Sequence, residues 1–116
     1  MAEYKAELFK IGGDKETDSG WQTLSSSPIE CTYRKVNNIV YIQCSARNVT
    51  IDNASVSLGS LPVGYRPAHR TAVRNGYVGN NDGYLEIIPL DGSAAFNFAS
   101  AGAGKYCHCN TAYIAD

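Results

Sequence analysis

Turn-forming residues recur at short intervals along the chain, and the runs between them are rich in Val, Ile, Tyr, Thr and Phe. The turn clusters are Gly12-Gly13-Asp14, Asp18-Ser19-Gly20, Asn37-Asn38, Asp52-Asn53, Asn80-Asn81-Asp82-Gly83, Asp91-Gly92 and Gly102-Ala103-Gly104. β-prone runs interrupted this often predict a sandwich or barrel, and no window keeps a helical period. With 116 residues, 44% of them apolar, the chain suits one hydrophobic core. We therefore predict a single all-β domain.

The clearest local unit is a predicted β-hairpin in residues 31–44. Two β-rich runs, Cys31–Val36 and Ile39–Cys44, flank Asn37-Asn38, and asparagine tolerates the positive φ that two-residue hairpin turns require. Counting outwards from this turn gives the pairs Val36–Ile39, Tyr33–Ile42 and Cys31–Cys44. The two cysteines fall at a non-hydrogen-bonded position, where opposing side chains approach most closely.

A second hairpin is expected from Tyr84–Leu90 and Ser93–Phe98, joined at Asp91-Gly92. Its second run alternates between two faces. Ala94, Phe96 and Phe98 are on one face, and Ala95 and Asn97 are on the other. The final run, Lys105–Ile114, is again typical of a strand.

The N-terminal segment Ala2–Ile11 fits two patterns. Tyr4, Leu8 and Ile11 would share a helical face, whereas apolar and charged residues alternate from Ala2 to Leu8 as in a strand. We favour an extended segment. The predicted organisation is an N-terminal arm or entry strand at residues 1–17 and a β-sandwich domain at 18–116.

The first hairpin carries apolar residues on both of its faces. They are Val36, Ile39 and Tyr41 on one face, and Tyr33, Val40 and Ile42 on the other. An antiparallel sheet that packs on one side only should be polar on its second side. We therefore expect a neighbouring layer or a neighbouring subunit to cover the second face.

Charge argues against several classes of partner. The 10 Lys and Arg residues and 11 Asp and Glu residues give a net charge of −1, so no basic field exists to attract nucleic acid or an anionic membrane. The apolar runs are far shorter than the roughly 20 residues of a membrane-spanning helix. Charged residues stand at positions 3, 5 and 7 (Glu3, Lys5 and Glu7), where a signal peptide needs an apolar core. We expect synthesis in a cytoplasm without export by the usual route.

Four cysteines allow three interpretations. Cys31, Cys44, Cys107 and Cys109 fit small hydrophobic side chains in a β core, which we favour. A Cys31–Cys44 disulfide agrees with the hairpin register, but a reducing compartment opposes it. A four-thiolate metal site would need all four to converge. Cys107-His108-Cys109 is not a compact site by itself, because His108 points to the opposite face of a strand from its neighbours.

The sequence gives little basis for catalysis. It contains no Gly-x-Ser-x-Gly elbow, no His-Glu-x-x-His and no phosphate loop. His69 and His108 stand in unrelated contexts, and the spacing of Glu86 and Asp91 is common on protein surfaces. We expect neither an enzyme nor a cofactor.

A binding surface is the better prediction. The chain has eight tyrosines, and the segment 75–84 places aromatic rings beside short amide and carboxylate side chains. Aromatic faces cover the C–H patches of sugar rings, and Asn or Asp side chains bond the hydroxyls. The candidate saccharide-binding residues are Tyr77, Asn80, Asn81, Asp82 and Tyr84. The alternative is a plain Asn-rich turn between half-buried strand tyrosines.

Three segments, taken in order, resemble a known family. They are Asp18-Ser19-Gly20-Trp21-Gln22-Thr23-Leu24, Tyr33-Arg34-Lys35-Val36-Asn37-Asn38-Ile39-Val40-Tyr41-Ile42-Gln43 and Leu58-Gly59-Ser60-Leu61-Pro62-Val63-Gly64-Tyr65-Arg66-Pro67. This order is similar to the C-terminal head domains of bacteriophage and prophage tail-fibre and baseplate receptor-binding proteins. The similarity covers residues 18–67, and no coiled-coil or Gly-x-y stalk precedes them.

The resemblance implies a jelly-roll-like antiparallel β-sandwich that assembles as a homotrimer in the virion tail, together with other phage tail proteins. Such heads recognise bacterial cell-surface polysaccharide and use no cofactor. The resemblance also implies structural roles for the matching residues. Trp21 would belong to the core or a subunit interface, and Tyr33 and Arg34 would belong to the hairpin. In the third segment Leu61, Pro62 and Pro67 would fix a rigid crossing, Gly64 would supply an unusual backbone angle, and Tyr65 and Arg66 would anchor it.

Two other functions stay open. The first alternative to saccharide recognition is a structural tail or baseplate component that contacts only virion proteins. The second is a small metal-stabilised β module that uses the four cysteines.

Overall fold

The computed structural model describes residues 17–76 and 83–115, which form a β-sandwich of two four-stranded sheets. The strands are β1 (Gln22–Ser25), β2 (Glu30–Val36), β3 (Ile39–Ile51), β4 (Ser55–Ser60), β5 (Thr71–Arg74), β6 (Tyr84–Ile87), β7 (Ser93–Asn97) and β8 (Gly102–Ile114). The first sheet has the order β1-β2-β3-β8 and the second has the order β4-β7-β6-β5. All pairings are antiparallel, so the predicted fold class is confirmed.

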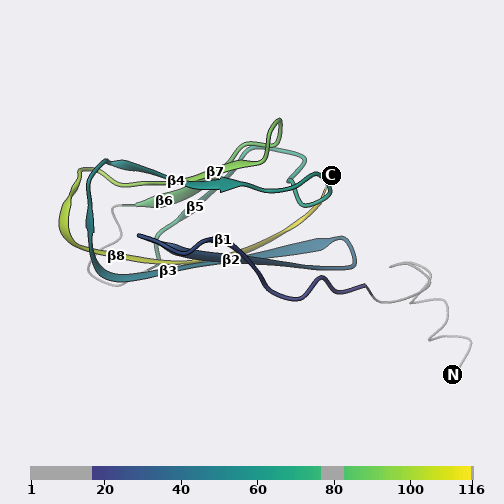
Figure 1. The fold of residues 1–116 in the computed structure, drawn as a ribbon. Helices are drawn as coiled ribbons and strands as arrows, with labels where there is room; N and C mark the ends of the chain where they lie inside the picture. Colours follow the sequence, from purple (N-terminus) through teal and green to yellow (C-terminus); the bar gives the residue numbers. More distant parts are fainter. Residues whose placement is uncertain (1–16, 77–82, 116) are drawn as a thin grey trace, which may run out of the picture.

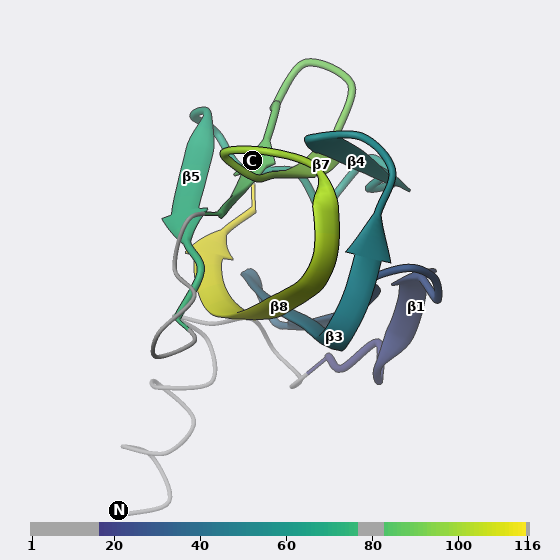
Figure 2. The same cartoon turned by 90° about the vertical axis from the view of Figure 1, so that its left-hand side faces the viewer.

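The two sheets lie as separate layers and are joined by the longest strands (Figure 1). At one end of the sandwich, β3 and β8 run side by side and curve from the lower layer towards the upper one (Figure 2). There β3 continues into β4, and β7 continues into β8. Since β3 pairs with β8 in one sheet and β4 with β7 in the other, a two-stranded ribbon crosses both layers, as in jelly rolls.

The first hairpin has the predicted register. Strands β2 and β3 pair Val36 with Ile39, Tyr33 with Ile42 and Cys31 with Cys44. Asn37, in the two-residue turn, has a φ of 56°, which asparagine adopts more easily than most residues. The turn therefore fixes which side chains of β2 and β3 face the core. β3 itself continues to Ile51, seven residues beyond the predicted end.

The second hairpin pairs as expected but ends earlier. Its first strand stops at Ile87, and Ile87 pairs with Ala94, so the prediction of a strand to Leu90 is wrong. Pro89 has no N–H to donate to a ladder, and Leu90 is 88% exposed. The connection therefore covers residues 88–92, which a hydrogen bond from Gly92 N to Ile88 O helps to close.

The predicted turn at Gly102-Ala103-Gly104 is also wrong, because these residues begin β8. Gly102 and Gly104 have φ values of 147° and 71°. The pairing with β3 is irregular there, with Val49 opposite Lys105 and Ile51 opposite Gly102. Glycines in a strand often mark such bulges. They occur where β8 bends between the layers.

The core lies between the inner faces of the two sheets. Its fully buried side chains include Ile29, Cys31, Val40, Ile42, Cys44, Ile51, Leu61, Leu85, Ile87 and Phe96. On β7, Ala94, Phe96 and the adjoining Phe98 are buried, as the alternation predicts. The predicted N-terminal arm lies outside the described residues except for Thr17, whose carbonyl accepts a hydrogen bond from Asn37 N.

Candidate functional site

Of the five predicted saccharide-binding residues, the structure describes Tyr84. Tyr77, Asn80, Asn81 and Asp82 lie outside the described residues. Tyr84 begins β6 on the outer face of its sheet, opposite Arg74 and Asn97, and is 41% exposed. Its ring is therefore available to a ligand on that face.

The segment Leu61–Pro67 crosses from the end of β4 towards the other sheet. Leu61 is fully buried, and its N–H bonds Gly92 O. A hydrogen bond from Tyr65 N to Pro62 O closes a turn in which Gly64 has a φ of 94°. This is the backbone region that favours glycine. This turn redirects the chain from the end of β4 towards the other sheet.

Arg66 ties this crossing to the β6–β7 connection. Its Nε donates to Leu61 O at 2.9 Å, and its Nη1 donates to Leu90 O at 3.4 Å. Gly92 lies beside both groups. It has a φ of 71°, and a Cβ there would overlap the Leu61 carbonyl oxygen and the Arg66 side chain. Only glycine fits this close approach of two loops.

Tyr65 joins the crossing to the first sheet. Its ring meets the Tyr33 ring edge-on, with centroids 5.3 Å apart. Its carbonyl accepts a 2.6 Å hydrogen bond from the Tyr113 hydroxyl, and Pro67 forms a bridge with Ala115. Burial raises the pKa of Tyr113, so this hydroxyl stays a donor at neutral pH. These contacts bring the second and third family-like segments together at one end of the sandwich.

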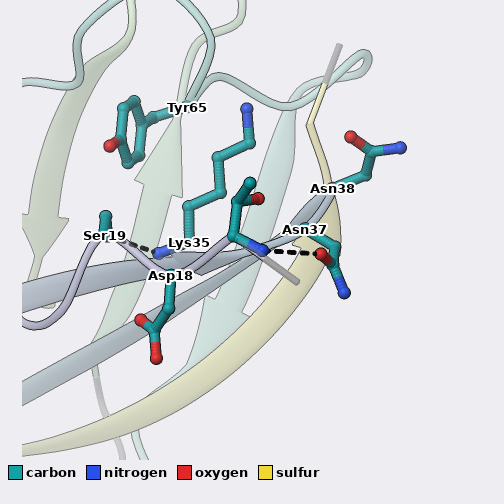
Figure 3. A pocket seen from close by; sticks show the side chains of 7 residues that line it. Asp18, Ser19, Lys35, Asn37, Asn38 and Tyr65 are labelled. Atoms are coloured by element: carbon teal, nitrogen blue, oxygen red, sulfur yellow. Dashed lines mark hydrogen bonds between the residues drawn. The ribbon is translucent and has the colours of Figure 1, made fainter. Parts of the chain in front are cut away.

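A polar hollow of about 380 Å³ lies at this end (Figure 3). It is lined by Thr17, Asp18, Ser19, Lys35, Asn37, Asn38 and Tyr65. The volume falls in the range of about 300–1,000 Å³ that is typical of small-ligand sites. Sequence reasoning missed this hollow. Its only sequence signal was two turn clusters, one at 18–20 and one at 37–38.

The walls of the hollow are held by short hydrogen bonds. Lys35 N donates to Ser19 Oγ at 2.9 Å, and Thr17 N donates to Asn37 Oδ1 at 3.0 Å. Lys35 Nζ donates to Gly64 O at 2.7 Å and lies 5.4 Å from the centre of the Tyr65 ring. An ammonium has three donors, so two stay available to a ligand. The hollow thus combines an aromatic ring, a cation and side-chain amides.

Asp18 also lines the hollow, but its carboxylate bonds Arg34 and the Gly20 backbone. Its carboxylate points away from Tyr65 in Figure 3 and accepts hydrogen bonds from Arg34, one of them 2.8 Å from Nε, and from Gly20 N at 2.9 Å. The Arg34 hydrogen bond, followed by that of Gly20, lowers the pKa of Asp18 to about 2. This pair fixes the loop 17–20 against β2.

Trp21 lies on the outer face of the first sheet and not in the core. It is 45% exposed, and the Arg34 guanidinium lies over its ring at 5.9 Å from the centroid. Together with Val36 and Tyr41, these two residues line a shallow, mainly apolar hollow of about 300 Å³. Of the two sites expected for Trp21, the core is therefore excluded.

The outer face of this sheet is apolar over several strands. We call it the outer apolar face, and its members are Trp21, Val36, Ile39, Tyr41 and Ile114. All except the half-buried Val36 are exposed, and Ile114 is 72% exposed. Ile39 pairs with both Val36 and Ile114, so the members are neighbours across β2, β3 and β8. The expectation of apolar residues on both sides of this hairpin is confirmed.

All four cysteines are buried free thiols on the inner face of the same sheet. Cys44 pairs with Cys31 on one side and Cys109 on the other. Burial, followed by a neighbouring thiol, raises the pKa of Cys107 to about 12 and that of Cys109 to about 11. His108 is exposed on the opposite face, as the strand alternation predicts.

Within the described residues, no three His, Cys, Asp or Glu side chains are grouped so that they would hold a metal ion. The four-thiolate site gains no support from this arrangement.

The other titratable residues considered for catalysis lie apart from the cysteines. Arg70 Nε donates a hydrogen bond to Glu86 Oε2 at 3.0 Å, and His69 is exposed in the loop before β5. In the two described stretches, no helix is long and apolar enough to cross a membrane.

A scan of the chain against models of known protein families found no match, and a search of curated proteins found no relative. The resemblance to phage head domains thus remains a prediction that depends on the three segments.

Proposed function

We propose that this chain is the receptor-binding head domain of a bacteriophage or prophage tail protein, and that it recognises saccharide on the bacterial surface. The observation that carries the proposal is the hollow in Figure 3. It is framed by residues from all three family-like segments, and its lining has the chemistry that sugars require. The virion tail, assembled in the host cytoplasm, is the proposed location.

Sugar rings have apolar C–H patches and polar edges, and both have partners in the hollow. Tyr65 offers part of an aromatic face. The Lys35 ammonium has donors left after its bond to Gly64 O, and the exposed Asn38 side chain offers an amide donor and acceptor. A saccharide would lie across the hairpin turn, with its hydroxyls towards Lys35 and Asn38. The segment 77–84 is the second candidate locus, because Tyr84 is exposed on the other sheet.

Assembly as a homotrimer is supported by the outer apolar face. A sandwich sheet with a solvated outer side is normally polar there, whereas this face exposes Trp21, Ile39, Tyr41 and Ile114. A second copy of the chain, related by rotation about a fibre axis, would bury them. Three weak saccharide sites on one trimer would then bind a polysaccharide by avidity.

A binding assay on purified bacterial cell-wall polysaccharide tests the proposal. We expect Asn38→Ala, or the paired change Tyr77→Ala with Asn81→Ala, to lower retention on the polysaccharide at least tenfold without lowering the melting temperature. Leu90→Ala is the matched control, because Leu90 is exposed outside both loci, and it should bind normally. Whichever variant fails to bind identifies the locus. Wild-type protein that binds no cell-wall material contradicts saccharide recognition.

Light scattering on a size-exclusion column tests the trimer. The expected mass is three times the 12.5 kDa of the chain, and Tyr41→Lys should convert the trimer to monomer by burying a charge in the interface. Ser57→Lys, at an exposed position of β4 in the other sheet, is the control. A wild-type monomer at high concentration would contradict the trimer.

The outer apolar face also favours a second candidate, a structural tail or baseplate component that contacts only virion proteins. A glycan array separates the two functions, since the structural component binds no sugar on it.

A further inference from the structure

We propose that Cys31 and Cys44 are a disulfide-forming pair, which closes by exchange with a small-molecule disulfide while the β2–β3 hairpin is still open to solvent. The inference rests on the hairpin geometry and not on the saccharide site, and it applies where a small-molecule disulfide is present, unlike the reducing compartment considered above. The two Sγ atoms are already in contact, because they lie 3.3 Å apart between adjacent strands. A disulfide bond is about 2.05 Å long, so closure brings the sulfurs about 1.3 Å nearer.

The backbone already suits the bond. Cys31 and Cys44 are directly opposite in the antiparallel register, at a non-hydrogen-bonded position. Cα atoms at such positions are about 4.5 Å apart, within the range of about 4.4–6.8 Å found in disulfides. Rotation of the two side chains is therefore enough, and no strand needs to shift.

Other pairings of the four thiols are less suitable. Cys109 also faces Cys44, but the alternation across β3 makes this a hydrogen-bonded pair, where side chains lie further apart. Cys107 and Cys109 are two residues apart on one extended strand, which separates their Cα atoms by about 6.8 Å and strains a bond between them. The geometry thus selects Cys31 with Cys44.

Burial determines when the bond forms. Cys31 is fully buried and Cys44 is 1% exposed. The hydrogen bond with Cys31, followed by burial, raises the pKa of the Cys44 thiol, so the folded protein holds almost no reactive thiolate there. The hairpin joins residues only 13 positions apart and can form before the two sheets pack. Oxidation then precedes burial.

The exchange is balanced with a disulfide such as oxidised glutathione. One cysteine thiolate attacks the glutathione disulfide, forms a mixed disulfide and releases one glutathione thiolate. The second cysteine thiolate attacks the protein sulfur of the mixed disulfide and displaces the other glutathione. The two protein thiols lose two electrons and two protons, and one glutathione disulfide becomes two thiols. Packing of the second sheet then shields the new bond from reductants.

Refolding in two redox buffers tests the inference. The full chain is unfolded and reduced, then refolded either with dithiothreitol or with oxidised and reduced glutathione. Remaining thiols are alkylated under denaturing conditions and counted by mass spectrometry. We expect four alkylated cysteines from the first buffer and two from the second, with a Cys31–Cys44 cross-linked peptide. The oxidised form should melt about 5–15 °C higher. Folded, reduced protein in the glutathione buffer should keep its thiols for much longer.

Two variants make the result specific. The double change Cys107→Ala with Cys109→Ala leaves only the proposed pair, and should still lose both thiols on oxidative refolding. Cys44→Ala should form no cross-linked peptide containing Cys31 and Cys109. Four free thiols after oxidative refolding of the wild-type chain would overturn the inference, and so would a Cys44–Cys109 peptide or stable glutathione adducts alone. The wild-type peptide map decides the matter even if Cys44→Ala does not fold.

Discussion

The two faces of the β1-β2-β3-β8 sheet are built from alternate residues of the same strands, but they meet different surroundings. On the inner face, Val40 and Ile42 of β3 are buried against the second sheet. On the outer face, Ile39 and Tyr41 have similar apolar character and stay exposed. Apolar character alone therefore does not decide which face becomes the core. The inner face is covered by the second sheet, whereas the outer face stays open in the protomer.

Replacing Ile42 and Tyr41 tests this difference directly and should give the largest effect. Ile42→Ala removes a buried side chain and should lower the free energy of unfolding by about 2–5 kcal/mol. Tyr41→Ala, on the exposed neighbour, should cost about 1 kcal/mol or less in dilute protein. Urea unfolding of both variants measures the two losses.

Repeating the urea unfolding at several protein concentrations separates the two faces further. If the outer face is covered only by other copies, the loss from Tyr41→Ala should grow with protein concentration, because assembly stabilises the wild type by mass action. The loss of packing that Ile42→Ala causes inside the protomer should not depend on protein concentration. Equal losses for the two variants in dilute protein would mean that the two faces do not differ in the monomer.

Sequence reasoning succeeded where interactions are local. The two-residue turn at Asn37-Asn38 fixes the register of β2 and β3, so the facing of every side chain in the hairpin follows from counting. It failed where glycine and proline allow more than one local structure. Gly102-Ala103-Gly104 suits a turn as well as a bulged strand, and only the pairing of β8 with the long β3 decides between them.

The hollow could not be predicted, for a different reason. Its walls come from the loop 17–19, the hairpin turn and Tyr65, which lie far apart in the sequence. The loop 17–19 is held to the hairpin by backbone hydrogen bonds of Thr17 and Ser19. Tyr65 is brought there by the crossing segment, whose Gly64 O and Tyr65 O accept bonds from Lys35 and Tyr113. No periodic pattern in the sequence predicts those contacts. Residues 58–67 were singled out only by resemblance.

Replacing Lys35 tests whether the inner face is apolar throughout. The expected change in the free energy of unfolding is of intermediate size. It occupies an inward position opposite Val40, yet its ammonium bonds Gly64 O. Lys35→Met keeps the stem against Tyr65 and removes this charged hydrogen bond, so the free energy of unfolding should fall by about 1–2 kcal/mol. Arg47→Met, at an exposed site on β3, is the matched control. If both variants are equally stable in urea, Lys35 contributes only its hydrophobic stem.

Asp18 and Arg34 provide the smallest effect, confined to acid solution. The folded protein holds the pKa of Asp18 at about 2, below its ordinary value of 3.8, chiefly through the Arg34 hydrogen bond. A lowered pKa in the folded state stabilises the protein above the unfolded-state value, and this contribution disappears as the pH falls from about 4 to about 2. Both side chains are about one-third exposed, so salt should weaken the effect.

Asp18→Asn removes the titrating group, so the wild type should be the more stable protein at pH 6, and the difference between the two should shrink as the pH approaches 2. Urea unfolding at several pH values in low salt measures it. In an Arg34→Met background most of the pH-dependent difference should vanish, because the main cause of the lowered pKa is gone. The outer face would then differ from the inner one in a second respect: its polar contacts respond to pH and salt, whereas the burial of Ile42 responds to neither. A difference between wild type and Asp18→Asn that stays constant down to pH 2 would instead assign Asp18 a role that does not depend on its charge, such as the turn it forms with Gly20 N.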